Sequence, residues 1–263
     1  MPATSNDDAR DAVHDATKLL DSARHVVVFT GAGISAESGV PTFRDALTGL
    51  WSRYDAQSLA TPQAFAEDPE LVWGWYEWRR RLVERVTPNA GHRAVAALES
   101  RAPRVTVITQ NVDDLHERAG SASPIHLHGS LFAPRCARCS HPSGAASSPT
   151  PVGAEDEGSR IAPPICPRCS GHIRPGVVWF GEALPEEALE SAVRAATDCD
   201  VLLTVGTSGL VYPAAEIPRL AARAGAAVIQ INPQPTPLDP IARVNLHGPA
   251  AEILPALLGP LGP

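Results

Sequence analysis

The chain has 263 residues, 44% of them hydrophobic and 19% charged, which is the composition of a soluble globular protein. This length has room for one large α/β domain with a smaller insert, or for two modest domains. The net charge of −7 makes a nucleic-acid partner unlikely on charge grounds and mildly favours basic partners. No segment approaches the roughly 18 apolar residues that span a bilayer, and the acidic N-terminus has no targeting signal. We therefore expect a cytoplasmic protein with no membrane partner.

Short apolar runs alternate with helical stretches along most of the chain. Residues 9–23 carry apolar residues at helical spacing, and further helices are expected at 185–197 and 213–224. The apolar runs predict strands at 25–29, 104–109, 125–127, 177–180, 200–205, 226–231 and 243–246. This alternation predicts an α/β fold, a parallel sheet with helices on both faces.

The first strand breaks into a glycine loop. Gly31 and Gly33 lack Cβ atoms where the backbone must approach a bulky anion such as a pyrophosphate. The free N–H groups of the next turn, around Ser35 to Glu37, are expected to point at that anion. A helix should follow in an ordinary dinucleotide fold, but Gly39 and Pro41 forbid a long one. The glycines alone are therefore weak evidence for a dehydrogenase.

A helix over 70–86 is rich in aromatic residues. Placing its residues at intervals of about 100° puts Arg79 in the middle of an apolar face and points Arg81 away from it. That face holds Val72, Trp75, Tyr76, Val83 and Val86. A buried, unpaired arginine is costly. Arg79 therefore either extends to water or forms an anion pocket with Tyr76, because residues three apart can converge on one group.

The segment Gln110-Asn111-Val112-Asp113 follows the strand over 104–109, and all of its residues except Val112 are polar. Open α/β sheets bind ligands at the carboxyl ends of their strands, so the polar side chains of this segment could bond ribose hydroxyls and a carboxamide. The alternative is that Asn111 or Asp113 caps a helix over 114–119. Two later strand ends carry similar turns, Gly206-Thr207-Ser208 and Asn232-Pro233-Gln234.

Two histidines, His126 and His128, lie on the run 125–129. Residues two apart face the same side of a strand. Spacing alone therefore does not say which histidine is catalytic, or whether the pair simply packs.

Four of the five cysteines form two Cys-x-x-Cys pairs that are separated by 26 residues: Cys136, Cys139, Cys166 and Cys169. Two such turns can surround one structural Zn²⁺ with no open position, and disulfides or free thiols are the alternative. The zinc ribbon also allows a rival interpretation as a nucleic-acid or protein-binding module, with Arg135, Arg138, Arg168 and Arg174 around it. Cys199 stands alone and is expected to be a small core residue.

The order of these motifs closely resembles that of the sirtuins, the NAD-consuming protein-lysine deacylases. The resemblance covers roughly residues 20 to 255. It is carried by Thr30–Arg44, Thr109–Asp113, Leu127–Phe132, the two cysteine pairs, Val177–Glu182, Gly206–Ser208 and Ile231–Asn232.

The resemblance implies NAD as co-substrate and one structural zinc. It selects His128 over His126 as the catalytic base for a ribose hydroxyl, because Gly129-Ser130-Leu131-Phe132 follows, and it puts Asp113 on the nicotinamide carboxamide. The cofactor-binding residues that it implies are Gly31, Ala32, Gly33, Ile34, Ser35, Ala36, Thr42, Phe43, Arg44, Trp51, Gln110, Asn111, Val112, Asp113, Gly206, Thr207, Ser208, Asn232, Pro233, Gln234 and Ala250.

The resemblance also bears on the substrate. Tyr76-x-x-Arg79 is similar to the pair of the sirtuin branch that removes succinyl, malonyl and glutaryl groups, and Ala60 matches the small residue that widens its acyl pocket. The expected activity is removal of succinyl, malonyl and acetyl groups from lysine, yielding nicotinamide and O-acyl-ADP-ribose. The substrate backbone would pair with a segment that includes Val177, Trp179 and Phe180.

The expected organisation is a Rossmann-like NAD-binding domain (1–45, 91–132 and 176–263), a helical insert with the acyl pocket (46–90) and a zinc module (133–175). The stretch 45–51 departs from the family pattern and is about one residue longer. A monomer acting on acylated lysines is expected. The alternatives are a mono-ADP-ribosyltransferase and a non-catalytic zinc-ribbon interaction protein.

Overall fold

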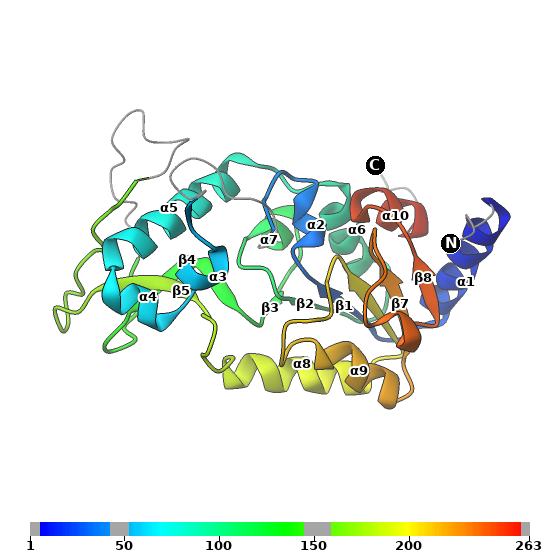
Figure 1. Cartoon of the computed structure of the whole chain (residues 1–263). Helices are drawn as coiled ribbons and strands as arrows, with labels where there is room; N and C mark the ends of the chain where they lie inside the picture. The colour runs from blue at the N-terminus through cyan, green and yellow to red at the C-terminus, as the bar shows by residue number, and fades with distance from the viewer. Residues whose placement is uncertain (1–5, 43–52, 145–158, 259–263) are drawn as a thin grey trace.

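The computed structural model of the chain describes residues 6–42, 53–144 and 159–258. A six-stranded parallel sheet forms its centre (Figure 1). In spatial order its strands are β3 (Ile125–His126), β2 (Val105–Thr109), β1 (Val26–Thr30), β6 (Val201–Val205), β7 (Ala227–Ile231) and β8 (Val244–Leu246). Counted along the chain this is the order 3-2-1-4-5-6 of the Rossmann fold. The predicted fold class is confirmed, together with six of the expected strands.

The strand expected at 177–180 is wrong. Val177 ends β5 (Ile173–Val177), which pairs antiparallel with β4 (Gly129–Cys136) in a separate two-stranded sheet. The next backbone N–H groups donate to different partners instead of forming a ladder: Val178 N to His128 O at 2.8 Å, and Phe180 N to Ala60 O at 2.9 Å. The apolar run therefore reflects burial between elements and not a place in the central sheet.

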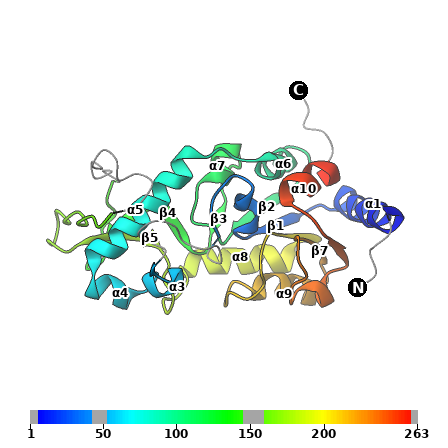
Figure 2. The same ribbon diagram turned by 45° about the horizontal axis from the view of Figure 1, so that its top comes forward.

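Helices cover both faces of the central sheet, as predicted (Figures 1 and 2). Val26 and Val28 pack into one core and Val27 and Phe29 into the other, so β1 has no solvent-facing side. The first core contains residues of α1 (Asn6–Ser22), α2 (Gly33–Ala36), α6 (Ala90–Glu99) and α10 (Ala250–Leu258). The second contains residues of α8 (Glu186–Asp198) and α9 (Glu216–Arg223). Two shorter elements are α7 (Leu115–Ala119) and a 3₁₀ turn, η2 (Asp239–Ile241).

A third core lies outside the sheet. It joins α3 (Ala56–Leu59), α4 (Pro62–Glu67) and α5 (Pro69–Arg85) to β4, β5 and the paired cysteines. Asp68 starts α5 by accepting a hydrogen bond from Leu71 N at 3.1 Å. The expectation of a single buried face on this helix is wrong. A Cβ on Gly74 would lie 2.0 Å from Ser159 O, so the chain at 159–161 covers the side away from β4 and β5, and Arg81 is partly buried.

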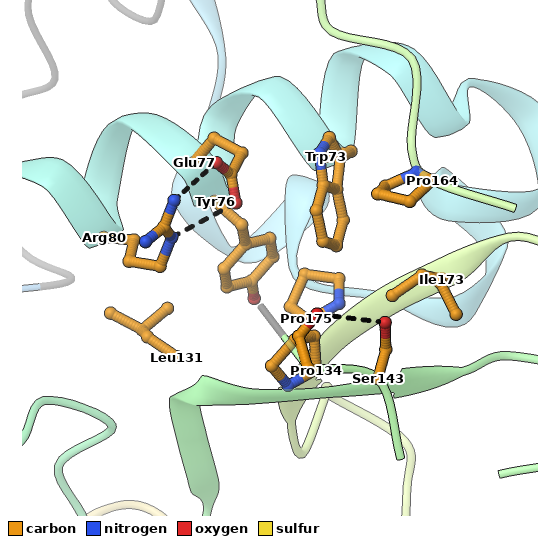
Figure 3. Close-up of a pocket in the computed structure, with 11 residues that line it drawn as sticks. Trp73, Tyr76, Glu77, Arg80, Leu131, Pro134, Ser143, Pro164, Ile173 and Pro175 are labelled. Carbon is orange, nitrogen blue, oxygen red and sulfur yellow. Dashed lines mark hydrogen bonds and ion pairs between the residues drawn. The ribbon is translucent and has the colours of Figure 1, made fainter. Parts of the chain in front are cut away.

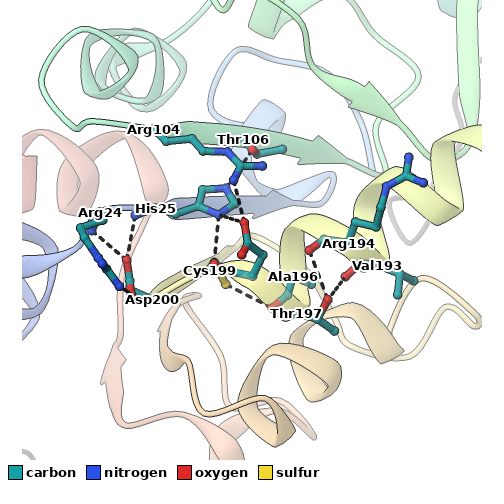
Figure 4. Close-up of polar contacts among 11 residues, drawn as sticks. Arg24, His25, Arg104, Thr106, Val193, Arg194, Ala196, Thr197, Cys199 and Asp200 are labelled. Atoms are coloured by element: carbon teal, nitrogen blue, oxygen red, sulfur yellow. Dashed lines mark hydrogen bonds and ion pairs between the residues drawn. The ribbon is translucent and has the colours of Figure 1, made fainter.

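A polar cluster ties the sheet together at the amino ends of its strands (Figure 4). His25 is buried, and its Nε2 lies 3.0 Å from Thr106 Oγ1. The Asp200 carboxylate accepts from the backbone N–H groups of Arg24 and His25 at 2.8 and 2.9 Å. Burial lowers the pKa of His25, with Arg104 acting in the same direction. This cluster anchors the starts of β1, β2 and β6.

The predicted domain limits at 132/133 and 175/176 fall inside β4 and β5, and the division into domains stays a prediction. Within the described ranges, no helix is both long enough and apolar enough to cross a membrane.

Candidate active site

The carboxyl ends of four strands lie level with one another. Thr30 pairs with both Thr109 and Val205, and Val205 pairs with Ile231. The strand order reverses between β1 and β6, which is where a Rossmann sheet opens a crevice for its ligand. The structure therefore brings to one edge the segments predicted to bind the cofactor, 31–36, 110–113, 206–208 and 232–234.

The two glycines of the first loop are required by a second loop of the protein. A Cβ on Gly31 would lie 2.8 Å from Gly206 O, and one on Gly33 would lie 2.7 Å from the same atom. Gly33 N donates to Gly206 O at 2.8 Å. The loops after β1 and β6 thus touch each other across the crevice, which explains both glycines without a ligand.

The predicted row of free N–H groups after this loop is wrong. Ile34 N donates to Gly31 O at 3.1 Å, and the amides of Ser35 and Ala36 donate to Ala32 O at 3.1 and 3.2 Å. The carbonyls of Gly31 and Ala32, just before the four-residue helix α2, thus accept from the amides of α2. In the described part of the chain, the Ala32 amide has no protein acceptor, and it remains the candidate donor to a pyrophosphate.

Ser35 is the centre of a buried polar network. Its hydroxyl donates to Asp113 Oδ2 at 2.9 Å and accepts from Asn111 Nδ2 at 3.1 Å. Asp113 Oδ1 also accepts from Leu115 N, the first amide of α7, at 3.1 Å, but the N-cap of α7 is Asp114, so neither Asn111 nor Asp113 is the predicted cap. Burial raises the pKa of Asp113, while the hydrogen bonds from Leu115 and Ser35 oppose that shift. Gln110 Nε2 donates to Thr207 Oγ1 at 2.9 Å and links the ends of β2 and β6.

The two histidines have different environments. His128 lies in the turn after β3, and its Nδ1 donates to Gln110 O at 2.9 Å. The neutral ring then carries its lone pair on Nε2, as a general base requires. Burial lowers the pKa of His128, with the Gln110 carbonyl opposing, so the ring is neutral at pH 7.

His126 is bonded at both nitrogens. Its Nδ1 donates to Asn111 O at 3.2 Å and its Nε2 to Glu117 Oε1 at 2.6 Å. Burial opposes protonation, but the Glu117 carboxylate outweighs it and raises the pKa of His126. A ring with two donated protons has no lone pair for catalysis. The geometry therefore favours His128, which spacing could not select.

Two further histidines behind this network were missed by the sequence analysis. His116 Nε2 lies 3.0 Å from Thr30 Oγ1, and His92 Nε2 lies 3.4 Å from Ser35 Oγ. Their ring centroids are 5.1 Å apart. Burial lowers the pKa of His92 to about 3 and that of His116 to about 4, so both are uncharged at pH 7. One sequence feature could have pointed to His116: Thr30 ends a buried apolar strand, and a buried hydroxyl needs a polar partner.

The residues predicted for the acyl pocket come together beside α5. Tyr76 is 4% exposed, and its oxygen accepts a hydrogen bond from Trp179 Nε1 at 3.0 Å. The Arg79 guanidinium carbon lies 5.1 Å from the centroid of the Trp75 ring and 5.7 Å from that of Tyr76. Arg79 Nη1 is buried, so this end of the guanidinium does not extend into water. Burial lowers the pKa of Arg79, while Tyr76 and Asp113 oppose that shift.

The predicted peptide-pairing segment is held differently from the expectation. The N–H groups of residues 178–180 all donate within the protein, including Trp179 N to Glu182 Oε2 at 2.8 Å. These amides are thus already used within the protein, and the pairing of this segment with a substrate peptide stays a prediction. Val177 and Trp179 are buried, whereas Phe180 is 43% exposed.

The four paired cysteines form a metal site. Their Sγ atoms all lie within 4.8 Å of one another. The two turns share one geometry, since Ser140 N donates to Cys136 O and Ser170 N to Cys166 O, both with positive φ at the serine. All are free thiols, with no disulfide. Four convergent thiolates fit one tetrahedral zinc ion, which confirms the predicted site.

The remaining predicted residues have varied positions. Ala250 is buried at the start of α10, where its carbonyl oxygen would lie 3.2 Å from a Cβ on Gly91. Asn232 is partly buried and donates to Gln234 O at 2.7 Å. Cys199 is buried, as expected of a core residue. Phe43, Arg44, Trp51 and the unusual stretch 45–51 lie outside the described residues.

The sheet order and the polar residues along its carboxyl edge define a dinucleotide-binding α/β protein. The model of the Sir2 family matches residues 31–213, and the chain belongs to this family. It is accordingly an NAD-dependent protein deacylase, with NAD as co-substrate and acylated lysine as substrate.

Relatives and solved structures cover nearly the whole chain. It is 61% identical over 242 residues to NAD-dependent protein deacylase 1 of Pseudomonas aeruginosa, covering 92% of this chain and 96% of the relative. The NAD-dependent protein deacylase of Mycobacterium tuberculosis is 55% identical over 233 residues, which is 89% of this chain and 96% of that protein. The crystal structure of a Sir2 homolog–NAD complex has a TM-score of 0.84 at 46% identity, covering 93% of this chain and 92% of that one.

Proposed function

We propose that this deacylase removes acidic acyl groups, succinyl and malonyl, from lysine, in addition to acetyl. The observation that carries the proposal is the position of Arg79 beside the Tyr76 ring within α5, near enough to Asp113 for that carboxylate to act on the pKa of the guanidinium. A guanidinium can bind a carboxylate through two parallel hydrogen bonds, and a phenol can add a third.

The protonation states of both groups support this assignment. Burial raises the pKa of Tyr76 to about 12, so the phenol keeps its proton at pH 7 and can donate it. A buried guanidinium gains more from an anionic partner than an exposed one, because the surroundings screen the pair less. Ala60 lies in the same core as Tyr76, and its small side chain leaves room for a longer acyl chain.

The protein residues divide the chemistry between them. Bound NAD supplies the ribose that receives the acyl group as nicotinamide leaves. In this proposal the Ala32 amide binds the pyrophosphate, and Asn111 and Asp113 bond the ribose and the carboxamide. His128 Nε2 takes a proton from a ribose hydroxyl, while Gln110 O holds the ring through Nδ1. Nicotinamide, lysine and O-acyl-ADP-ribose are the expected products.

Arg79→Met tests the acyl preference. The value of kcat/KM on a succinyl-lysine peptide should fall about a hundredfold, because a charged, bidentate hydrogen bond is lost. The value on the matching acetyl-lysine peptide should fall far less. Arg81→Met, two residues along the same helix, controls for the loss of one positive charge. Equal losses on both peptides would refute the pocket, and mass spectrometry of the products would expose transfer of ADP-ribose to the peptide instead.

A further inference from the structure

Trp179 lies where the predicted catalytic turn, the acyl pocket and β5 meet. It is 3% exposed. The amide before it donates to His128 O at 2.8 Å, and the amide after it donates to Ala60 O at 2.9 Å. The backbone at this residue is therefore fixed at once to the catalytic turn and to the pocket wall.

The indole ring is fixed as well. The Arg174 guanidinium carbon lies 3.4 Å from its centroid, and the Phe65 ring centroid is 5.3 Å away. Arg174 is itself held by both oxygens of Glu182, at 2.5 and 2.8 Å. Glu182 Oε2 also accepts from Trp179 N. The direction of the indole N–H is thus set by an ion pair between a buried arginine and a partly buried glutamate, and not by the pocket alone.

That N–H determines how the Tyr76 hydroxyl is used. An indole nitrogen can only donate, whereas a phenol has one proton to donate and can also accept. With 3.0 Å between Trp179 Nε1 and Tyr76 Oη, the phenol oxygen must be the acceptor. The phenolic proton therefore points to some other acceptor. A phenol is protonated at pH 7 even at its ordinary pKa of 10.0, and burial raises the pKa of Tyr76 further, to about 12, so that proton is always present.

We infer that Trp179 is a positioning residue for acyl specificity: by donating to Tyr76 Oη it directs the phenolic proton toward the carboxylate of an acidic acyl group beside Arg79. The inference rests on the proposed function. An acetyl group has no carboxylate to accept that proton, so Trp179 should affect acidic acyl groups more than acetyl.

Trp179→Phe is the test, because it keeps an aromatic ring against Arg174 and removes the N–H. We expect KM for a succinyl-lysine peptide to rise about three- to tenfold, as for one neutral hydrogen bond, with a much smaller change in kcat. The KM for the acetyl-lysine peptide should change less. In a Tyr76→Phe background the same substitution should add nothing, because the acceptor is already gone. Equal effects on both peptides, or additive effects of the two substitutions, would overturn the inference.

Two comparisons separate its failure from that of the proposed function. Wild type and Arg79→Met are assayed on the same peptides. If wild type does not form O-succinyl-ADP-ribose from the succinyl-lysine peptide, or if Arg79→Met affects both peptides equally, the proposed function fails and the inference fails with it. If those assays behave as proposed and Trp179→Phe does not discriminate, only the inference fails. Should Phe at 179 prevent folding, Tyr76→Phe alone must raise the succinyl KM selectively, or the inference is wrong.

Discussion

The sheet region and the region around α5 bury different kinds of residue. Strands β1 and β6 are buried throughout and carry no charged side chain. Around α5, charged pairs are shielded from solvent instead: Arg80 with Glu77 at 2.8 Å, both buried (Figure 3), and Arg174 with Glu182, of which Arg174 is buried and Glu182 partly buried. In the first region the loops that meet at the crevice are built from glycine and backbone contacts. In the second, the pocket is built from side chains.

This difference suggests that the two regions have separate roles, cofactor binding for the sheet region and substrate choice for the α5 region. Backbone contacts, such as that of Gly33 N with Gly206 O, are set by the course of the backbone and not by side chains. Side-chain substitutions therefore have little scope to change these contacts at the predicted cofactor edge. Buried charges are tolerated only where their hydrogen bonds are satisfied, so the α5 region is maintained by specific partners, and under the proposed function it sets the acyl preference. If this division of roles is correct, substitutions in the first region affect all substrates, and substitutions of Tyr76 and Arg79 in the second discriminate between them.

His128→Asn should have the largest effect on activity, and the loss should be the same whichever acyl group the substrate carries. Loss of the base predicts a fall in kcat/KM of about a thousandfold on both succinyl and acetyl peptides, with thermal unfolding little changed. His126→Asn is the matched control, since His126 has no lone pair to offer, and it should cost much less. If His128→Asn lost activity on only one of the two peptides, the proposed difference between the sheet region and the α5 region would be wrong. In wild type, the acidic fall of kcat/KM should lie below pH 6.5, because burial lowers the pKa of His128.

Cys166→Ser should weaken the α5 region while sparing the sheet. One thiolate of four is lost, so zinc content measured by metal analysis should fall sharply, and stability should drop by about 3 kcal/mol. Cys199→Ser, at a buried cysteine outside the cluster, controls for the substitution itself and should leave the zinc content unchanged. Retention of stoichiometric zinc by Cys166→Ser would contradict the site. Loss of zinc should impair succinyl and acetyl peptides while NAD binding, followed by calorimetry, persists.

The smallest expected effect is a change in how stability depends on pH, and it concerns His116, which lies behind the carboxyl edge of the sheet. Folding lowers the pKa of His116 from 6.5 to about 4, so between these values the unfolded chain binds a proton that the folded one does not. Stability is therefore lost as pH falls, by about 2 kcal/mol at pH 5 for this histidine. His116→Gln should remove that part of the difference between urea unfolding at pH 7 and at pH 5. His14→Gln, on the exposed side of α1, should not. If the free energy of unfolding changed equally between pH 7 and pH 5 in both variants, His116 would not be the source of the pH dependence.

The parts that sequence predicted well are those with local signals. The Cys-x-x-Cys turns recur at a fixed spacing, and alternating apolar runs and helices predict a doubly covered sheet. The parts that failed depend on partners distant in sequence. The run after β5 has the composition of a strand, yet its amides donate to His128 O, Glu182 and Ala60 O. The free amides expected after Ser35 are used by carbonyls three or four residues back, which a glycine pattern does not reveal.

The amino-acid order by itself determined the fold class, the zinc ligands and which segments supply polar residues to the cofactor edge, because periodicity and short motifs act within one element. Only the tertiary structure showed that His126 is bonded at both ring nitrogens and His128 at one, placed His92 and His116 behind the predicted site, and aimed Trp179 at Tyr76. Those outcomes depend on which carbonyl, carboxylate or hydroxyl lies within about 3 Å of a given atom, and such distances are set by the packing of elements far apart along the chain.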